Sequence, residues 1–398
     1  MTYGSVCSGI EAATEAWKGL GWRCAFVAEV EPFPCAVLRE RLGATRPARP
    51  LDPREVPEGA ERRRRKSWLR GLAHVRGGGS LPNHGDFTKI AGSDIGTGID
   101  LLVGGTPCQA FSAAGLKEGL EDERGMLALE FARLAFRSGC RWVVWENVTG
   151  VLAGRGGRDF ARLLSALCGW EVSVPEGGWG NSGVCTGAPG HFGVAWRVLD
   201  AQYTRVPEFP GALPQRRRRV ILVGRLGSWE RAAEVLFEGE LRGGDTPPRR
   251  EEGAVHAPDV QAGAGDPLGE DADRGGRAAC LPVDMTNFDG RERRGYIGCV
   301  GSDGDAAYPL TRRRPSAVCT DANGPVPLVR YLLPVEAERI MGFPDGYTAV
   351  PWKGRAAEDC PDGPRYRALG NSMCVNVMAW VGRRIDEAEG KEARGDAG

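Results

Sequence analysis

The stretch from Leu101 to Ser112 constrains the fold of this chain more than any other part of it. An apolar run, Ile99 to Val103, has the length of a short buried strand and ends at a pair of glycines. Pro107 then fixes a backbone angle and removes an N–H donor just before Cys108. The pattern predicts a strand that ends in a stiff loop and offers one thiol at the carboxyl end of a parallel sheet. A cysteine taken alone is more often a small buried hydrophobe, so the rest of the chain has to decide.

Length and composition indicate a globular protein with room for two domains. The chain has 398 residues, of which 41% are hydrophobic. No apolar run approaches the ~20 residues of a membrane span, and the amino terminus lacks the basic flank and apolar core of a signal peptide. The 12 cysteines are scattered, with no C-x-x-C pair. We therefore expect no metal site and a reducing, cytoplasmic location.

The formal charge is balanced, but the basic residues are clustered. The 52 basic and 52 acidic side chains give a net charge of zero, which argues against a general nucleic-acid coat. Basic clusters in a neutral protein fit a local phosphate-contacting surface or a solvated face, and the sequence leaves both open. The clusters are Arg62 to Lys66, Arg216 to Arg219, Arg291 to Arg294 and Arg312 to Arg314.

The amino-terminal residues have the pattern that opens a Rossmann-like unit. A predicted strand over residues 3–8 enters a tight turn at Gly9, and Glu11 to Leu20 has the composition of a helix. A second predicted strand, Cys24 to Glu31, ends in acidic residues. A carboxylate at that place commonly accepts hydrogen bonds from ribose hydroxyls, although one glycine in the turn makes the pattern weak by itself.

Alternating strands and helices continue to about residue 225 and predict an α/β domain with a doubly wound, mostly parallel sheet. Residues 45–82 contain several prolines and an arginine run, so we expect an inserted surface loop with some disorder. After residue 226 long apolar runs become rare, which favours a separate loop-rich region. Predicted helices lie at 126–136, 159–167, 331–341 and up to residue 385, and predicted strands at 141–145, 194–199 and 220–223.

Three kinds of reactive group stand at the ends of predicted strands. A thiolate, here Cys108, adds best to a carbon that a proton donor has made electron-poor. A carboxyl in a dry pocket, here Glu146, can hold that proton, and an arginine of the 216–219 run can stabilise a carbonyl oxygen. Together with a cofactor cleft at Gly9, these groups suit activation of a pyrimidine ring for group transfer. Taken alone, Glu146 could equally be a salt-bridged residue at a strand end, and the arginine run could equally be a solvated surface.

The chain resembles the C5-cytosine DNA methyltransferases of bacteria and their phages. The matching blocks occur in the order of that family and span nearly the whole chain. They are Ser8-Gly9-Ile10, Ala28-Glu29-Val30-Glu31, Gly85-Asp86-Phe87, Gly105-Thr106-Pro107-Cys108-Gln109, Glu146-Asn147-Val148, Gln215 to Arg219, Glu336 through Gly342-Phe343-Pro344, and Gly370-Asn371-Ser372.

The resemblance implies a catalytic role for four residues. Cys108 would attack C6 of a cytosine flipped out of duplex DNA, and Glu146 would hold or protonate N3. Arg219 would contact the base near O2, with Arg217 supporting it. C5 would then take the methyl group of S-adenosylmethionine, and loss of the C5 proton would expel the thiolate.

The resemblance also implies a cofactor site. Glu29 matches the ligand of the ribose and Asp86 the ligand of the adenine amino group. The other positions that match the lining of the cleft are Cys7, Ser8, Gly9, Val30, Phe87, Pro107, Leu127, Asn371 and Ser372.

Three positions depart from the family pattern. Cys7 stands where an aromatic residue is usual, and Glu11 replaces the usual second glycine of the first turn. Val30 replaces a residue that is often large. A bulky side chain in that turn would either crowd the methionine end of the cofactor or face away from it.

The family analogy gives a domain division. Residues 1–225, completed by 365–386, would form the catalytic and cofactor-binding domain. Residues 226–345 would form a smaller target-recognition domain in the major groove, and 387–398 an acidic, disordered tail. The candidate base contacts, for which phosphate contact or a solubility role is an equal alternative, are Arg291, Arg293, Arg312, Arg313 and Arg314.

Two rival functions remain open at this point. The same fold methylates RNA in one branch of the family, although the long variable region favours double-stranded DNA here. A DNA-binding protein without catalysis would be expected to lack the nucleophile or the acid, and both are present. We expect a monomer that acts alone or beside a cognate restriction endonuclease, and no membrane partner; the target site cannot be read from the sequence.

Overall fold

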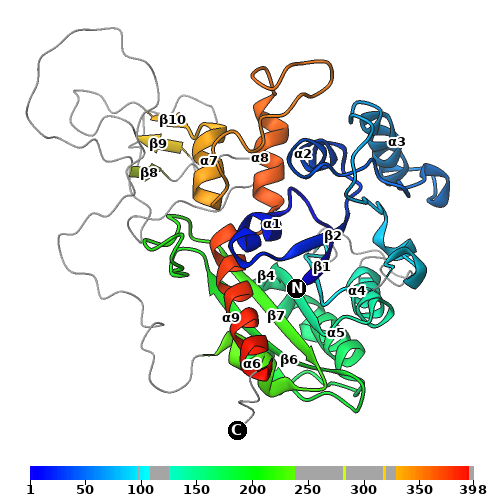
Figure 1. Ribbon diagram of the computed structural model, residues 1–398, viewed down its shortest axis with the longest axis vertical. Coiled ribbons are helices and arrows are strands. Elements are labelled where there is room, and N and C mark those ends of the chain that lie inside the picture. The colour runs from blue at the N-terminus through cyan, green and yellow to red at the C-terminus, as the bar shows by residue number, and fades with distance from the viewer. Residues whose placement is uncertain (97, 108–124, 238–280, 284–316, 320–328, 394–398) are drawn as a thin grey trace, which may run out of the picture.

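The computed structural model describes residues 1–96, 98–107, 125–237, 281–283, 317–319 and 329–393 (Figure 1). Cys108 lies outside these residues, as do all the candidate base-contacting arginines after residue 290. The loop that leads to the predicted nucleophile is therefore described up to Pro107.

A seven-stranded sheet forms the centre of the molecule, with the order β2-β1-β3-β4-β7-β6-β5. The chain passes from β1 to β2 on one side and then crosses to β3 on the other, so β1 lies at a topological switch point, where ligands bind in open α/β sheets. The strands are β1 (Thr2–Val6), β2 (Arg23–Ala28), β3 (Leu101–Gly104), β4 (Trp142–Val148), β5 (Ser182–Cys185), β6 (Phe192–Asp200) and β7 (Arg218–Leu226).

The two halves of this sheet differ in direction. β2, β1, β3 and β4 pair in parallel, whereas β7, β6 and β5 each pair antiparallel to their neighbours. The expected doubly wound α/β architecture is confirmed, and the sheet is mixed, because the strands after β4 return as antiparallel neighbours. A second, three-stranded antiparallel sheet contains β8 (Leu281–Val283), β9 (Ala317–Cys319) and β10 (Val329–Tyr331).

The strands are apolar on both faces because helices cover both sides. Along β4, Trp142 and Val144 belong to one hydrophobic cluster, and Val143 and Trp145 belong to the other. This alternation follows from the two-residue period of a strand. Figure 1 shows α9 and α6 on the near face and α4 and α5 on the opposite side. The helices of these layers are α1 (Ala12–Trp17), α4 (Gly125–Ser138), α5 (Arg158–Cys168), α6 (Trp229–Leu236) and α9 (Val375–Ala393).

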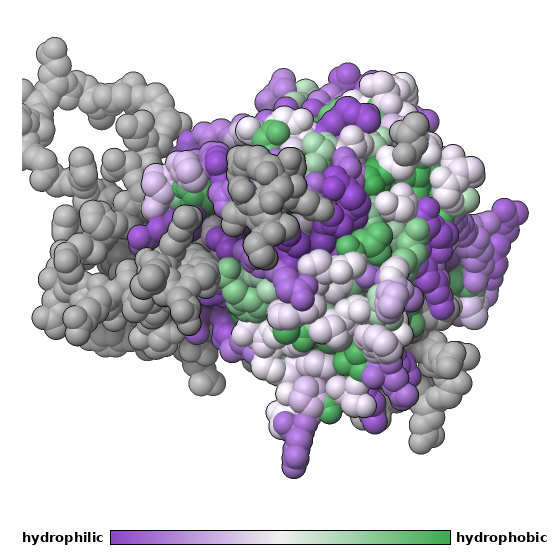
Figure 2. Space-filling view, turned by 60° about the horizontal axis from the view of Figure 1, so that its bottom comes forward, coloured by the Kyte–Doolittle hydropathy of each residue, from purple (hydrophilic) through white to green (hydrophobic). Residues whose placement is uncertain are grey.

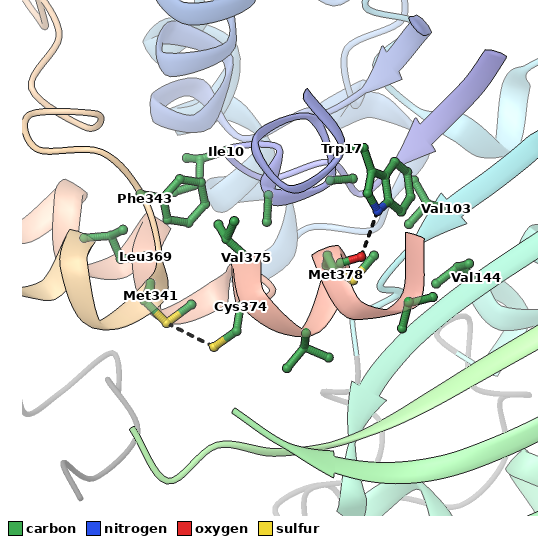
Figure 3. Close-up of a cluster of buried hydrophobic side chains, with 14 of the residues drawn as sticks. Ile10, Trp17, Val103, Val144, Met341, Phe343, Leu369, Cys374, Val375 and Met378 are labelled. Atoms are coloured by element: carbon green, nitrogen blue, oxygen red, sulfur yellow. Dashed lines mark hydrogen bonds between the residues drawn. The ribbon is translucent and has the colours of Figure 1, made fainter. Parts of the chain in front are cut away.

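The carboxyl-terminal helices return to the amino-terminal turn. Trp17 Nε1 donates to the carbonyl of Met378 in α9 at 2.8 Å (Figure 3). Tyr347, in the segment between α7 (Pro334–Met341) and α8 (Asp362–Asn371), donates its hydroxyl to the carbonyl of Ile10 at 2.9 Å. The last part of the chain is thus packed against the first turn and helps to set its position.

Residues 45–82 contain an ordered helix, which corrects the expected disordered loop. Helix α3 (Ala60–Leu72) carries the arginine run and packs against α2 (Pro32–Leu42). Arg62 pairs with Glu58 at 3.1 Å, and Arg65 pairs with Glu61 at 3.1 Å, both with the (i, i+4) spacing that supports a helix. The prediction missed the helix because the run was interpreted by composition alone.

Two expected boundaries also differ from the structure. α6 packs on β6 and β7, so residues 229–236 continue the large domain beyond the expected limit at 225. α9 extends to Ala393, and Glu389 accepts a hydrogen bond from Trp142 Nε1 at 2.7 Å. The beginning of the expected disordered tail is therefore a helix held against the sheet.

On the face drawn in Figure 2, hydrophobic residues form small separate patches among hydrophilic ones. Among the helices of the described residues, none combines the length and the apolar character that a membrane crossing requires.

Candidate active site

The loop that leads to Cys108 is fixed to the end of the neighbouring strand. Gly104 of β3 pairs with Trp145 of β4. Trp145 Nε1 donates to Thr106 Oγ1 at 3.1 Å, and Asn147 Nδ2 donates to the carbonyl of Thr106 at 3.0 Å. Because these groups are buried, the bonds hold the loop firmly as far as Pro107.

Glu146 lies at this same place. Its carboxylate pairs with Arg219 Nε at 3.2 Å, and the two side chains are only 14% and 18% exposed. A Cβ added to Gly105 would lie 3.3 Å from Glu146 Oε2 and from Met373 Cε. Gly105 thus lets the loop approach the carboxylate, which explains the need for glycine there. The predicted acid, one predicted arginine and the start of the predicted nucleophile loop are brought together.

Arg217 is buried next to the site and binds the backbone of the carboxyl-terminal helices. Its guanidinium is 3% exposed, and Nη2 donates to the carbonyls of Gly370 at 3.1 Å and Ser372 at 2.5 Å. Burial, and then the charge of Arg219, lower the pKa of Arg217. The contacts attach the residue before β7 to the junction of α8 and α9. At this junction Ser372 is buried and Asn371 is exposed.

The first turn and the end of β2 form the predicted cofactor crevice. Glu29 Oε2 accepts a hydrogen bond from the backbone N–H of Gly9 at 2.7 Å, and Oε1 accepts from Val30 at 2.8 Å. Burial raises the pKa of Glu29 to about 7, against the lowering effect of these bonds. A Cβ at Gly9, which has a φ of +56°, would meet no atom within 4 Å, so the turn borders open space. Ser8 Oγ accepts from Ala28 at 3.1 Å and completes the connection of turn and strand.

Glu11 faces away from the crevice, which settles the alternative that the sequence left open. Its side chain is 1% exposed, and its carboxylate accepts a hydrogen bond from Ser5 Oγ at 2.7 Å beneath the turn. Burial raises the pKa of Glu11 to about 7. Cys7 and Glu11 both have positive φ angles, 49° and 64°, a strained conformation that is stored in this turn.

The remaining predicted cofactor residues differ in their burial and in the contacts that they make. Asp86 caps a short turn by accepting from Thr88 Oγ1 at 2.7 Å, and Phe87 is buried in the second hydrophobic cluster. Burial raises the pKa of the Cys7 thiol. Leu127 is partly buried against the same cluster as Phe87, and Pro107 is exposed.

Part of this site lies within a match to a known protein family. The family described as C-5 cytosine-specific DNA methylase matches residues 80–240, which include the Thr106 loop, Glu146 and Arg219. Over these residues the chain is similar to that family. The match agrees with the resemblance that the sequence blocks indicate.

Individual relatives extend the likeness over the whole chain. One, from Escherichia phage P1 and named DNA N-6-adenine-methyltransferase, is 30% identical over 524 residues and covers 99% of this chain. The chain spans only 62% of the length of that relative. The type II methyltransferase M.Eco47II of Escherichia coli is 27% identical, over 76% of this chain and 67% of its own length. The crystal structure of the S. pombe Dnmt2 methyltransferase, 14% identical, matches 97% of this chain and 98% of its own with a TM-score of 0.54, a likeness of fold.

Within this candidate site, three residues were not predicted to act there. Thr106 and Asn147 form the link between loop and strand, and Met373 lies against Gly105. Asn147 carried a signal, because an amide directly after a strand-end acid is well placed to bind the neighbouring loop. Met373 carried none, because its approach depends on how α8 and α9 fold back.

Asn147→Ala is expected to destabilise the protein and to loosen the catalytic loop. The substitution leaves the carbonyl of Thr106 and the N–H of Val148 without their present partners. Such a loss costs about 1–3 kcal/mol of unfolding free energy. Urea denaturation measures this change, and Ser182→Ala, at an exposed position of β5, is the control that should change little. An unaltered midpoint for Asn147→Ala would contradict the proposed link.

Proposed function

We propose that this chain transfers a methyl group from S-adenosylmethionine to C5 of a cytosine flipped out of duplex DNA. The observation that carries the proposal is the Glu146–Arg219 pair, held against the Gly105–Pro107 loop. Cys108 is the next residue along that loop. The family model includes all three parts, which supports the assignment.

The residues divide the chemistry between them. The Cys108 thiolate forms a bond to C6 of the cytosine while Glu146 supplies or holds a proton at N3. Arg219 holds Glu146 in place and faces the base carbonyl O2, where its charge stabilises the electron-rich ring. After C5 has taken the methyl group, loss of the C5 proton to a base reforms the double bond and breaks the S–C6 bond, so the thiolate is regenerated.

The crevice beside β1 and β2 fits the proposed methyl donor. Glu29 offers carboxylate oxygens suited to ribose hydroxyls, and Asp86 offers an acceptor for an adenine amino group. The open space at Gly9 leaves room for the cofactor, because the side chain of Glu11 bonds to Ser5 and does not occupy it. When bound, S-adenosylmethionine supplies an activated methyl group. Residues of this chain bind and orient it, and Ser372, with Asn371, closes the other side.

Residues between about 237 and 328 are proposed to recognise the target sequence, by family analogy, and most of them lie outside the described residues. The proposed substrate is double-stranded DNA. We further propose that the protein acts as a monomer, either beside a cognate restriction endonuclease or alone.

A second activity has one specific observation in its favour. The phage P1 relative is named an N-6-adenine methyltransferase. Because this chain covers only part of that relative, the name does not decide which base is modified here. The Glu146–Arg219 arrangement favours cytosine, since an exocyclic amine is not activated by a thiol adding to the ring.

The base is identified by following the methyl group. Purified protein, duplex DNA and S-adenosylmethionine with a labelled methyl group are incubated, and the DNA is digested to nucleosides. The proposal predicts label in 5-methyldeoxycytidine, and bisulfite sequencing then gives the sequence context. Label only in N6-methyldeoxyadenosine, or only in transfer RNA offered in parallel, would overturn it.

Covalent trapping tests the mechanism apart from turnover. In the presence of S-adenosylmethionine, C5 of a 5-fluorocytosine would take the methyl group beside the fluorine, so no C5 proton is left to lose and the S–C6 bond should persist. We expect a stable protein–DNA adduct with the natural chain and none with Cys108→Ser. DNA binding with neither an adduct nor label in cytosine would indicate a binding protein without catalysis.

A further inference from the structure

Helix α3 presents two kinds of basic residue on different sides. Arg62, Arg64 and Arg65 each pair with a nearby acid, at 3.1, 2.8 and 3.1 Å. The side chains of Arg63, Lys66 and Arg70 are exposed, and no described residue forms an ion pair with them. The first set has its charge neutralised within the protein, whereas the second set presents its charge to solvent.

The unpaired cations lie along one line. Their spacing of three and then four residues places them on one face of the helix, roughly opposite the partly buried Trp68 and the buried Leu72. From Arg63 to Arg70 the helix rises about 10 Å. Successive phosphates on one DNA strand advance about 3.4 Å along the axis, so this length matches about three of them.

The helix is attached firmly enough to present these charges at a fixed place. Gly71 packs so closely on Pro32 that a Cβ would lie 2.7 Å from its ring. At the other end, Arg65 donates to the carbonyl of Asp52 at 3.1 Å. Arg46 Nε donates to the carbonyl of Val75, just after the helix, at 2.7 Å.

The contacts also locate α3 relative to the proposed active site. Pro32 begins α2 directly after Glu29 to Glu31, at the carboxyl edge of the parallel strands. Just past the end of α3, the ring of His74 contacts Trp352 in the segment between α7 and α8. The carboxyl end of α3 thus lies at the same edge of the sheet as the cofactor crevice and the catalytic groups.

We propose that Arg63, Lys66 and Arg70, here called the α3 basic face, bind the phosphate backbone of duplex DNA outside the target base. The inference rests on the proposed function, which makes duplex DNA the substrate. Charge complementarity and the regular spacing favour this partner, because phosphates accept point-charge contacts without reading sequence. The face adds affinity and leaves the choice of base to other residues.

The test measures binding rather than methyl transfer. The full chain with Arg63→Gln, Lys66→Gln and Arg70→Gln is titrated into labelled duplex DNA by fluorescence anisotropy at several salt concentrations. We expect Kd to rise about tenfold or more at moderate salt, and the slope of log K against log salt to fall by about 2.7. The KM for DNA should rise while kcat stays unchanged.

A matched variant removes the same charge elsewhere. Lys18, Arg23 and Arg137 are exposed and lie near the opposite, amino-terminal edge of the sheet. Their replacement by Gln should leave Kd and the salt slope nearly unchanged. Arg63→Lys with Arg70→Lys keeps the charge and should also keep the affinity, because a phosphate contact needs a cation rather than a particular fork. Urea midpoints establish that each variant is folded.

The possible outcomes distinguish a failure of the α3 proposal from a failure of the proposed methyl transfer. Equal losses in the α3 variant and the matched control, or no change in the salt slope, would overturn the α3 basic face. Preference of the natural chain for transfer RNA over duplex DNA would also overturn it. Salt-dependent binding through α3 without any methyl transfer would uphold it and refute the proposed function alone.

Discussion

Glu146→Gln is expected to slow methyl transfer to cytosine by about 10²–10⁴-fold, the range for loss of a positioned acid–base group. The amide keeps the size of the side chain but cannot supply a proton to N3 of the base. Because Glu146 is partly exposed and pairs with Arg219 at the rim of the site, its loss should affect the rate far more than the stability. Single-turnover transfer of a labelled methyl group measures the rate.

Glu389→Gln is the matched control for this rate. Glu389 is also a paired carboxylate beside β4, but it binds Trp142 and Arg141 at the amino-terminal end of the strand. Its substitution should leave the single-turnover rate nearly unchanged. Equal rates for Glu146→Gln and the natural chain would show that the carboxyl does not take part, and the proposed mechanism would then fail.

The stability of the cofactor-free protein is expected to fall as the pH rises from about 4.5 to about 7. Burial raises the pKa of Glu11 and of Glu29 to about 7, from 4.5. Between these values the folded state binds more protons than the unfolded state. Raising the pH therefore removes stability until both carboxyls are ionised. Each group contributes about 3 kcal/mol to this loss.

Glu11→Gln isolates the part that belongs to Glu11. The amide cannot ionise, so the variant should lose about 3 kcal/mol less than the natural chain over this pH range. Among the described residues, Tyr3, Cys24, Glu29 and Tyr347 are the titratable groups that interact electrostatically with Glu11, and no cation is among them. Urea unfolding near both ends of the range, about pH 5 and pH 8, measures the difference. Parallel pH curves for the two proteins would contradict the raised pKa of Glu11.

The sequence predicted local features whose cause lies in neighbouring residues. The apolar run before Gly104, the turn at Gly9 and the acid at the end of β2 all stand where local spacing placed them. The sequence-based prediction was wrong for α3, because the proline and arginine content of residues 45–82 suggested a loop. Ion pairs four residues apart, from Glu58 to Arg62 and from Glu61 to Arg65, stabilise a helix that composition does not reveal.

The sequence could not predict contacts between distant segments. The bond from Arg217 to Ser372 joins residues 155 positions apart, and the antiparallel return of β7 beside β4 brings Arg219 to Glu146. The direction of Glu11 depended on the space between β1 and α1. Each of these is decided by packing of elements that meet only in the folded chain.

The order of strands, turns and reactive residue types was determined by the sequence alone, since hydrophobic period and turn chemistry act over a few residues. Which of those residues share a site was decided by the tertiary structure, because only the folded sheet and its returning helices bring Gly105, Glu146 and Arg219 together and join Arg217 to Ser372. The ordered α3 basic face likewise exists only once Gly71 has packed on Pro32.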